Sequence, residues 1–256
     1  VGGCAAALAM AEAGRRVVRT EEFAWIGGQL TAQAVPPDEH GWIEQFGGTR
    51  NYRRFRELVR AYYRAHYPLL PVVRENPRLN PGNGWVSPLC HEPRVALAVL
   101  EAMLAPHVSS GRVRILRQHR VVAVRADGAD RLAAVVVRDL GAGDERELRA
   151  SYFLDATENG DLLPLAGAEH VTGTEARADT GEASAPERAA PANVQAFSAC
   201  FVLEERVGEN HVIARPERYG FWRSYVPKLQ PAWPGPLLGW AGLNPRTMQA
   251  MRYHFD

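Results

Sequence analysis

The chain has 256 residues, which is enough for one large or two modest domains with a sizeable core. Its formal net charge is +1 and its pI is about 8.0, so composition gives no case for nucleic acid or an anionic membrane as a partner. The three cysteines are far apart, which argues against a disulfide framework and offers no CxxC pair for a metal. No segment is apolar and long enough to span a bilayer. No signal peptide is visible either, so a cytoplasmic location is expected.

Glycines and small, helix-favouring residues fill the start of the chain. Gly2 and Gly3 are followed by Cys4 and an alanine-rich run that ends at Gly14, a residue typical of a helix C-cap. A glycine at a helix N-terminus lets a pyrophosphate approach free backbone N–H groups. Gly3 would be the last glycine of a G-x-G-x-x-G motif whose earlier part precedes Val1. Because the chain opens inside this motif without an initiator Met, we expect a fragment truncated at both ends.

An apolar stretch that ends in two acids comes next. Residues 17–20 predict a strand, and Glu21 follows at its carboxyl end. In a dinucleotide-binding domain, an acid at this place accepts hydrogen bonds from the adenosine ribose. Glu21 is therefore the candidate ribose ligand, with a solvated strand-end charge as the alternative. Glu22 is a second candidate, for which solvation is the simpler interpretation.

A second pair of glycines follows soon after the acids and indicates backbone that passes close to a bulky group. Residues 27–33 read GGQLTAQ and residues 36–39 read PPDE. This pattern resembles the bacterial FAD-dependent oxidoreductase family of the glutathione-reductase-like FAD/NAD(P)-binding superfamily. The resemblance implies an α/β fold: an FAD-binding Rossmann-like domain with an inserted β-meander and the start of a substrate (cap) domain. It also implies that five residues lie along the pyrophosphate, the ribityl chain or the flavin ring: Gly27, Gly28, Gln29, Leu30 and Thr31.

A second motif occurs at residues 155–161, which read DATENGD after a predicted apolar strand at 151–154. It resembles the family's Asp-Ala-Thr-Gly-x-Gly-Asp turn, which passes the FAD adenosine or pyrophosphate. Ala156, Thr157 and Asp161 match and are further cofactor-binding candidates, whereas Glu158 stands where the family has Gly. Capping of the next helix is the alternative role for Asp161.

Two helices are predicted between these motifs. The first runs over residues 52–66, capped by Thr49 or Asn51, and its arginines form either a solvated face or an anion site. The second runs over residues 94–104. Cys90 and His91 precede it and form either a reactive pair or a buried thiol beside a capping histidine. No catalytic acid or base can be firmly named, and the weak candidates are His91, His40 and Gln33.

A period-2 pattern begins near residue 113 and predicts strands at 113–115, 121–124 and 132–137. The resemblance implies that Val122 lies near the adenine. We expect the FAD-binding domain to cover residues 1–170, with a helical and loop insertion at about 34–110 and the β-meander at 112–150. Residues 171–193 form an exposed linker. A truncated cap domain then starts at 194–256 and includes a strand at 195–203.

The resemblance implies an FAD-dependent oxidoreductase. Its flavin takes a hydride or electrons from an unidentified small-molecule substrate and passes electrons to O2, a quinone or a protein. The Pro- and Gly-rich loop at 67–85 is expected over the substrate side of the flavin. Two alternatives stay open. One is a heterodisulfide-reductase-like electron-transfer subunit, and the other is a non-catalytic binding module on the same fold.

Overall fold

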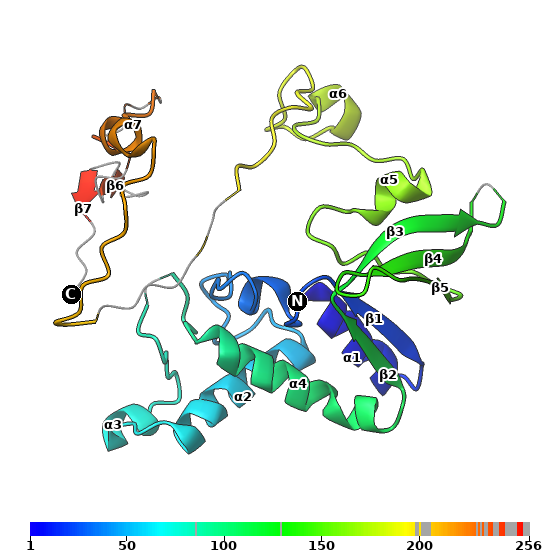
Figure 1. Ribbon diagram of the computed structural model, residues 1–256, viewed down its shortest axis with the longest axis horizontal. Coiled ribbons are helices and arrows are strands. Elements are labelled where there is room, and N and C mark those ends of the chain that lie inside the picture. The colour runs from blue at the N-terminus through cyan, green and yellow to red at the C-terminus, as the bar shows by residue number, and fades with distance from the viewer. Residues whose placement is uncertain are drawn as a thin grey trace. The chain divides into compact units, whose positions relative to one another are not determined.

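The structure is a computed structural model that describes residues 1–84, 86–128, 130–197, 200, 206–228, 230, 232, 235–237, 241–243 and 250–252, the last two ranges by backbone alone. The chain divides into two units, Val1–Val202 and Leu203–Asp256. Figure 1 traces the chain, and every cofactor-binding candidate lies in the first unit.

One helix and a parallel pair of strands open the first unit. Helix α1 (Gly2–Glu12) leads into β1 (Val17–Glu21), which pairs in parallel with β2 (Val113–Arg117). The buried face of α1 consists of residues at the i, i+3, i+4, i+7 spacing of an amphipathic helix, namely Cys4, Ala7, Leu8 and Ala11. These small side chains let α1 pack closely on β1 and α4.

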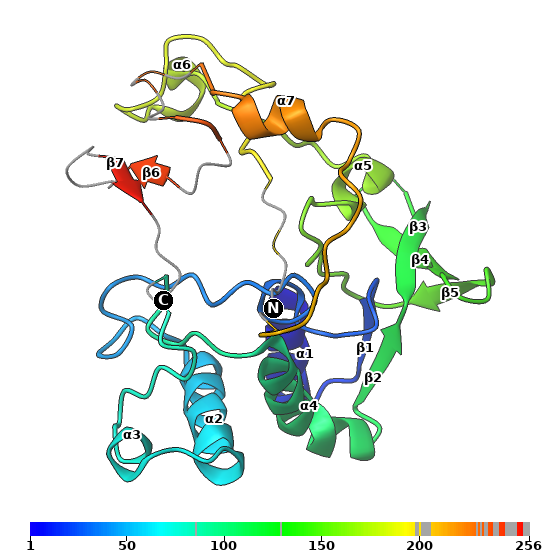
Figure 2. The same ribbon diagram turned by 60° about the vertical axis from the view of Figure 1, so that its left-hand side comes forward.

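The parallel pairing of β1 and β2 requires a long crossover. It contains α2 (Arg50–His66), the short α3 (Pro71–Arg74) and α4 (Pro93–Ser109), and Figures 1 and 2 both show α2 beside α4. Thr49 caps α2 by accepting a hydrogen bond from the Tyr52 N–H at 3.3 Å. The second predicted helix ends too early, because α4 continues past Pro106. That proline falls near the C-terminus, where the hydrogen bond it removes is one of the last of the helix.

The main core of the first unit lies where α1, α2, α4 and the loop at residues 26–30 meet. Its fully buried members include Ile26, Val59, Leu89 and Leu104. The same core therefore fixes both the first turn of α1 and the double-glycine loop, which are the parts of the chain that carry the first motif.

The antiparallel sheet consists of β3 (His119–Ala126), β4 (Leu132–Asp139) and β5 (Glu145–Arg149), in that order. The prediction that residues 113–115 belong to the meander is wrong, because they lie in β2 and pair with β1. A period of 2 identifies a strand but not its partner. The strand predicted at 151–154 is also wrong. Its residues have no regular structure, Tyr152 and Leu154 are exposed, and no described strand supplies it with hydrogen bonds.

The remaining elements are short. The first unit ends with α5 (Leu162–Ala166) and α6 (Arg177–Thr180), and most residues from 171 to 193 are exposed. The second unit contains α7 (Tyr219–Ser224) and the antiparallel strands β6 (Ala241–Leu243) and β7 (Ala250–Arg252). The strand predicted at 195–203 is absent at 195–197, and most of its remainder lies outside the described residues. No described helix has the length and hydropathy needed to cross a membrane.

Two arginines of α2 fit neither interpretation of its basic face, whereas others are exposed as the solvated interpretation expects. Arg56 and Arg60 are buried and paired with carboxylates of this chain. Arg56 donates to Glu39 and Glu44, and Arg60 donates through Nη1 to Glu44 at 3.1 Å and through Nε to the carbonyl of Leu79 at 2.9 Å. This ion-pair network ties the loop after the double glycine to α2. The exposed arginines of the helix include Arg50, Arg53 and Arg54.

We predict that Gly27→Ala destabilises the first unit by about 2–4 kcal/mol, because overpacking adds to backbone strain. Gly27 has φ +114°, and a Cβ there would lie 2.7 Å from Leu100 Cδ1 and 2.8 Å from Thr31 Cγ2. Gly14 is the matched control. It has φ +79° with no atom within 4 Å of a Cβ, so Gly14→Ala should cost only about 1 kcal/mol. Urea unfolding of both variants measures the difference, and equal losses would contradict the packing argument.

Candidate functional site

Three segments that are far apart in the sequence meet at the start of α1. A Cβ on Gly3 would lie 3.5 Å from the Cβ of Ala156, and a Cβ on Gly28 would lie 2.9 Å from Oε1 of Glu158. Glycine at these positions is what lets the 156–158 segment pack so closely on the helix end and the loop. We call the meeting point the cradle, and it consists of residues 1–4, 27–28 and 156–158. The structure thus brings parts of both sequence motifs to one place.

The helix end inside the cradle has no side-chain cap. Val1 is the N-cap residue of α1, and its backbone nitrogen lies 3.1 Å from the carbonyl oxygen of Gly27. The first N–H groups of an α-helix have no partner within the helix, and the helix dipole makes this end positive. Gly2 and Gly3 add no side chain that would shield those groups. The cradle is therefore suited to an anion.

Arg19 is the residue that sequence analysis missed. Its side chain is only 9% exposed, and its Nη2 donates to Oε2 of Glu21 at 2.8 Å. Its Nε lies 3.2 Å from the Cβ position of Gly3. Nε and Nη1 are both buried without a hydrogen-bond acceptor in the described part of the chain. The available signal was the period of 2 in a strand, which places Arg19 on the same face as Val17 and Glu21.

Arg19 acts on two of the cofactor-binding candidates, because it is salt-bridged to Glu21 and its charge influences the Cys4 thiol. The Glu21 side chain is 11% exposed and salt-bridged to Arg19, so the solvated interpretation of Glu21 is wrong. Cys4 is buried in α1, and burial raises the pKa of its thiol although the Arg19 charge opposes the shift. Cys4 is therefore an uncharged thiol at neutral pH. Glu22 differs from both, because it is partly exposed and pairs with Arg120 at 3.2 Å.

The side chains of the double-glycine loop are buried or bonded within the protein, so its backbone is the part that can contact a ligand. Leu30 and Thr31 are buried, and Thr31 Oγ1 donates to the carbonyl of Ile26 at 2.7 Å. Gln29 lies in the short 3-10 turn η1 (Gly28–Leu30), and its amide donates to Asp38 at 3.1 Å. A ligand along this loop would therefore meet main-chain groups of these residues.

The loop at residues 155–158 is held by its own hydrogen bonds. Asp155 accepts from the N–H and hydroxyl of Thr157 at 2.9 and 2.8 Å and from the Leu162 N–H at 2.9 Å. Burial opposes its ionisation, but these bonds outweigh it and hold the pKa of Asp155 below its usual value. Asp161 makes no capping bond, so the capping role proposed for Asp161 is wrong and Asp155 bonds the first turn of α5 instead.

Glu158 places a carboxylate beside Gly28. That charge would repel an anion in the cradle, but the side chain is exposed and can rotate into solvent at little cost. Val122 lies in β3 where the register with β4 shifts between Val121 and Ala123, and none of the cradle contacts described above involves it.

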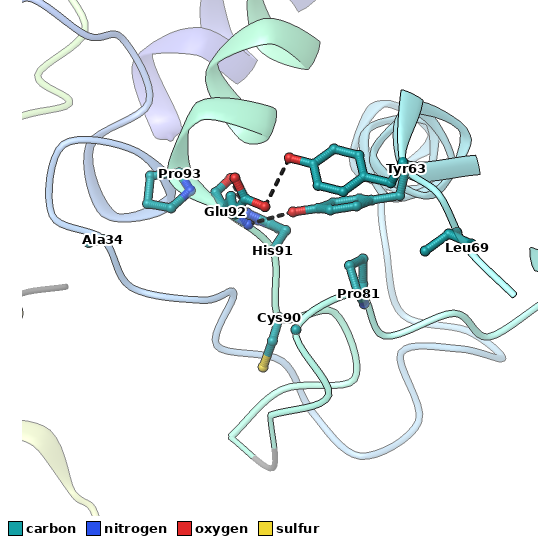
Figure 3. A pocket seen from close by; sticks show the side chains of 10 residues that line it. Ala34, Tyr63, Leu69, Pro81, Cys90, His91, Glu92 and Pro93 are labelled. Carbon is teal, nitrogen blue, oxygen red and sulfur yellow. Dashed lines mark hydrogen bonds between the residues drawn. The ribbon is translucent and has the colours of Figure 1, made fainter. Parts of the chain in front are cut away.

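A hollow of about 480 Å³ lies at the N-terminal end of α4 (Figure 3). Tyr63 and Tyr67 form one wall, with ring centroids 4.5 Å apart. The Tyr67 hydroxyl donates to Oε1 of Glu92 at 2.9 Å, and the Tyr63 hydroxyl accepts from the Glu92 N–H at 2.8 Å. Burial raises the pKa of Tyr63 to about 12. The other lining residues are Ala34, Leu69, Pro81, Gly82, Cys90, His91 and Pro93.

Cys90 and His91 do not form a reactive pair. The Cys90 thiol donates to the carbonyl of Ser87 at 3.4 Å, whereas Nδ1 of His91 lies 3.2 Å from the carbonyl oxygen of Glu92. Nε2 of His91 is buried without a partner in the described structure, and burial lowers the pKa of the ring. His91 is therefore neutral at pH 7.

The other two catalytic candidates lie outside the lining of the hollow. His40 is exposed, and its ring centroid lies 6.2 Å from that of Trp42. Gln33 donates its backbone N–H to the carbonyl of Gly28 at 3.2 Å. Of the three catalytic candidates, His91 is the one that lines this hollow.

A family profile described as FAD dependent oxidoreductase matches residues 1–241. The chain belongs to the FAD-dependent oxidoreductase family. Among curated proteins, none matches the chain. The family's cofactor is FAD, and the cradle fits its diphosphate, because an uncapped helix end and unpaired guanidinium nitrogens are donors in need of acceptors. Within the described ranges, no group of three or more His, Cys, Asp or Glu side chains could hold a metal ion.

The lowered pKa of His91 predicts how this residue affects stability. As pH falls below 6.5, the unfolded chain protonates His91 before the folded chain does, so the free energy of unfolding decreases. Replacement by glutamine removes this linkage. His91→Gln should therefore lose less stability than the wild type between pH 7 and pH 5 in urea unfolding at each pH. His66→Gln, an exposed site on α2, is the control, and identical pH slopes for wild type and His91→Gln would contradict the assignment.

Proposed function

We propose that this protein oxidises a small organic molecule by moving a hydride equivalent to FAD held at the cradle. The free N–H groups of α1 and the charge of Arg19 suit the diphosphate, and the Glu21 carboxylate is suited to the ribose hydroxyls. FAD supplies the two-electron redox chemistry when bound. Gly28 allows the cofactor to pass close to the backbone, since it carries no side chain.

We assign the substrate to the hollow at the start of α4. The observation that carries this proposal is that one short segment reaches both places. Gly27 and Gly28 belong to the cradle, and Ala34, a few residues later, lines the hollow. Helix α4 makes the same connection, because Pro93 lines the hollow and Leu100 packs on Gly27. A flavin that starts at the cradle and follows this segment would present its ring to a substrate in the hollow.

The lining of the hollow supports a role in excluding water and orienting the substrate. Two tyrosine rings, Leu69 and two prolines provide apolar contact area, and Glu92 provides a polar group fixed by Tyr67. We assign His91 the role of proton acceptor. Its ring is neutral, and a substrate hydroxyl or amine that reaches Nε2 would find an acceptor without another partner. The electron acceptor that follows is O2, a quinone or a protein.

Filling the hollow should separate substrate turnover from cofactor binding. Leu69→Trp introduces a bulky ring into the hollow, whereas Leu70→Trp changes a neighbour that is 68% exposed. Misplacing a substrate in this way lowers the rate by about 100-fold. We predict that loss for anaerobic flavin bleaching in Leu69→Trp with the best substrate from a panel of alcohols, amines and acids. Leu70→Trp should bleach at the wild-type rate, and FAD affinity should be the same in all three proteins.

The same experiment distinguishes the alternatives. Equal bleaching rates in the two variants would contradict the hollow as the substrate site. FAD binding without bleaching by any member of the panel would favour a binding module. Iron in the purified protein would favour an electron-transfer subunit. Failure to bind FAD at saturating concentration would overturn the proposed function.

A further inference from the structure

We infer that Arg19 is a cofactor-binding residue that holds the diphosphate of the dinucleotide with the nitrogens that have no partner among the described residues. The inference rests on the proposed function, because it concerns the same cradle. It adds a binding residue that lies inside β1, outside both glycine motifs.

The position of Arg19 is unusual for a charged side chain. It is 9% exposed and lies over Gly3 at the first turn of α1, where its Nε is 3.2 Å from the Cβ position of that glycine. Its Nη2 donates to the Glu21 carboxylate. Nε and Nη1 are buried with no acceptor among the described residues. A single carboxylate thus satisfies one part of a guanidinium that has five N–H donors.

Leaving buried charged donors unpaired is costly, so a ligand that brings acceptors gains more here than at a solvated arginine. The neighbouring groups are donors too, because the first N–H groups of α1 lack partners within the helix. The required ligand is therefore an anion with several oxygens. A diphosphate meets this requirement, and guanidinium–phosphate contacts are strong and often bidentate.

Because Arg19 is bonded to Glu21, it can act in two ways: by binding the diphosphate directly or by orienting the Glu21 carboxylate. If it binds the diphosphate directly, its loss weakens ADP but has little effect on adenosine. If it acts only by orienting Glu21 toward the ribose, its loss weakens adenosine and ADP equally. These two ligands share the adenine and the ribose and differ in the diphosphate alone.

The test is isothermal titration of the full chain with FAD, ADP and adenosine. We compare the wild type with Arg19→Met, and use Arg16→Met as a control that removes one exposed positive charge at the far end of α1. Two charged hydrogen bonds predict that Arg19→Met weakens FAD and ADP by about 10- to 100-fold. Adenosine should change by less than about twofold, and Arg16→Met should match the wild type for all three ligands.

Each other outcome has a definite meaning. Equal losses for ADP and adenosine, or wild-type ADP affinity in Arg19→Met, would overturn the diphosphate assignment and leave the proposed function standing. No FAD binding by the wild type would overturn the proposed function itself. If Arg19→Met does not fold by circular dichroism, Arg19→Lys replaces it. That variant keeps the charge but has a single donor group, so unchanged ADP affinity would likewise overturn the assignment.

Discussion

The close packing of three chain segments at the first turn of α1 is the constraint on which the rest of the site depends. Gly3, Gly27 and Gly28 each lie where a Cβ would meet another segment. Because these glycines lack side chains, the side chains of Arg19, Ala156 and Glu158 can pack directly against the helix end and the loop. Donors then gather at one point, and an acceptor-rich anion is the ligand that satisfies them. Affinity for FAD, in this account, comes from backbone geometry reinforced by one buried arginine.

The loop that borders the hollow is held by a network of buried and partly buried ion pairs. Glu39 accepts hydrogen bonds from Tyr52 and Arg56, and Glu44 pairs with Arg56 and Arg60. Such a network adds little net stability compared with apolar packing, but removing one member leaves an uncompensated charge and is strongly destabilising. Its effect here is to hold one segment of the chain in position. It fixes the loop after Ala34 against α2, and so maintains one side of the hollow.

Much of this arrangement could be predicted from the sequence, because local signals specify it. The cap at Thr49, the strand that ends at Glu21 and the glycine pairs each follow from side-chain chemistry at a single position. Such local signals do not show which strand pairs with which, or which side chains of distant segments contact each other. The pattern at 113–115 identifies a strand but cannot show that it joins β1. The burial of Arg56 likewise depends on Glu39, which lies in a loop far along the chain.

The same reason explains why Arg19 was missed. An isolated arginine in a strand is usually solvated, and only the packing of α1 over β1 shows that this one is enclosed. The loop at 67–85 supplies Tyr67, Leu69 and Pro81 to the lining of the hollow, and its expected place over the flavin stays a prediction. The position of the hollow relative to the cradle was not predictable, since it depends on how α4 spans from Pro93 to Leu100.

Amide hydrogen exchange, measured residue by residue by NMR with and without saturating FAD, tests the central claim most directly. The claim is that the three segments of the cradle bind the cofactor as one unit. It predicts that FAD slows exchange at Gly3 and Cys4, at Gly27 and Gly28, and in the 156–158 turn together, while the β3–β5 sheet is unchanged. FAD binding that leaves exchange at the first turn of α1 unaffected would contradict it.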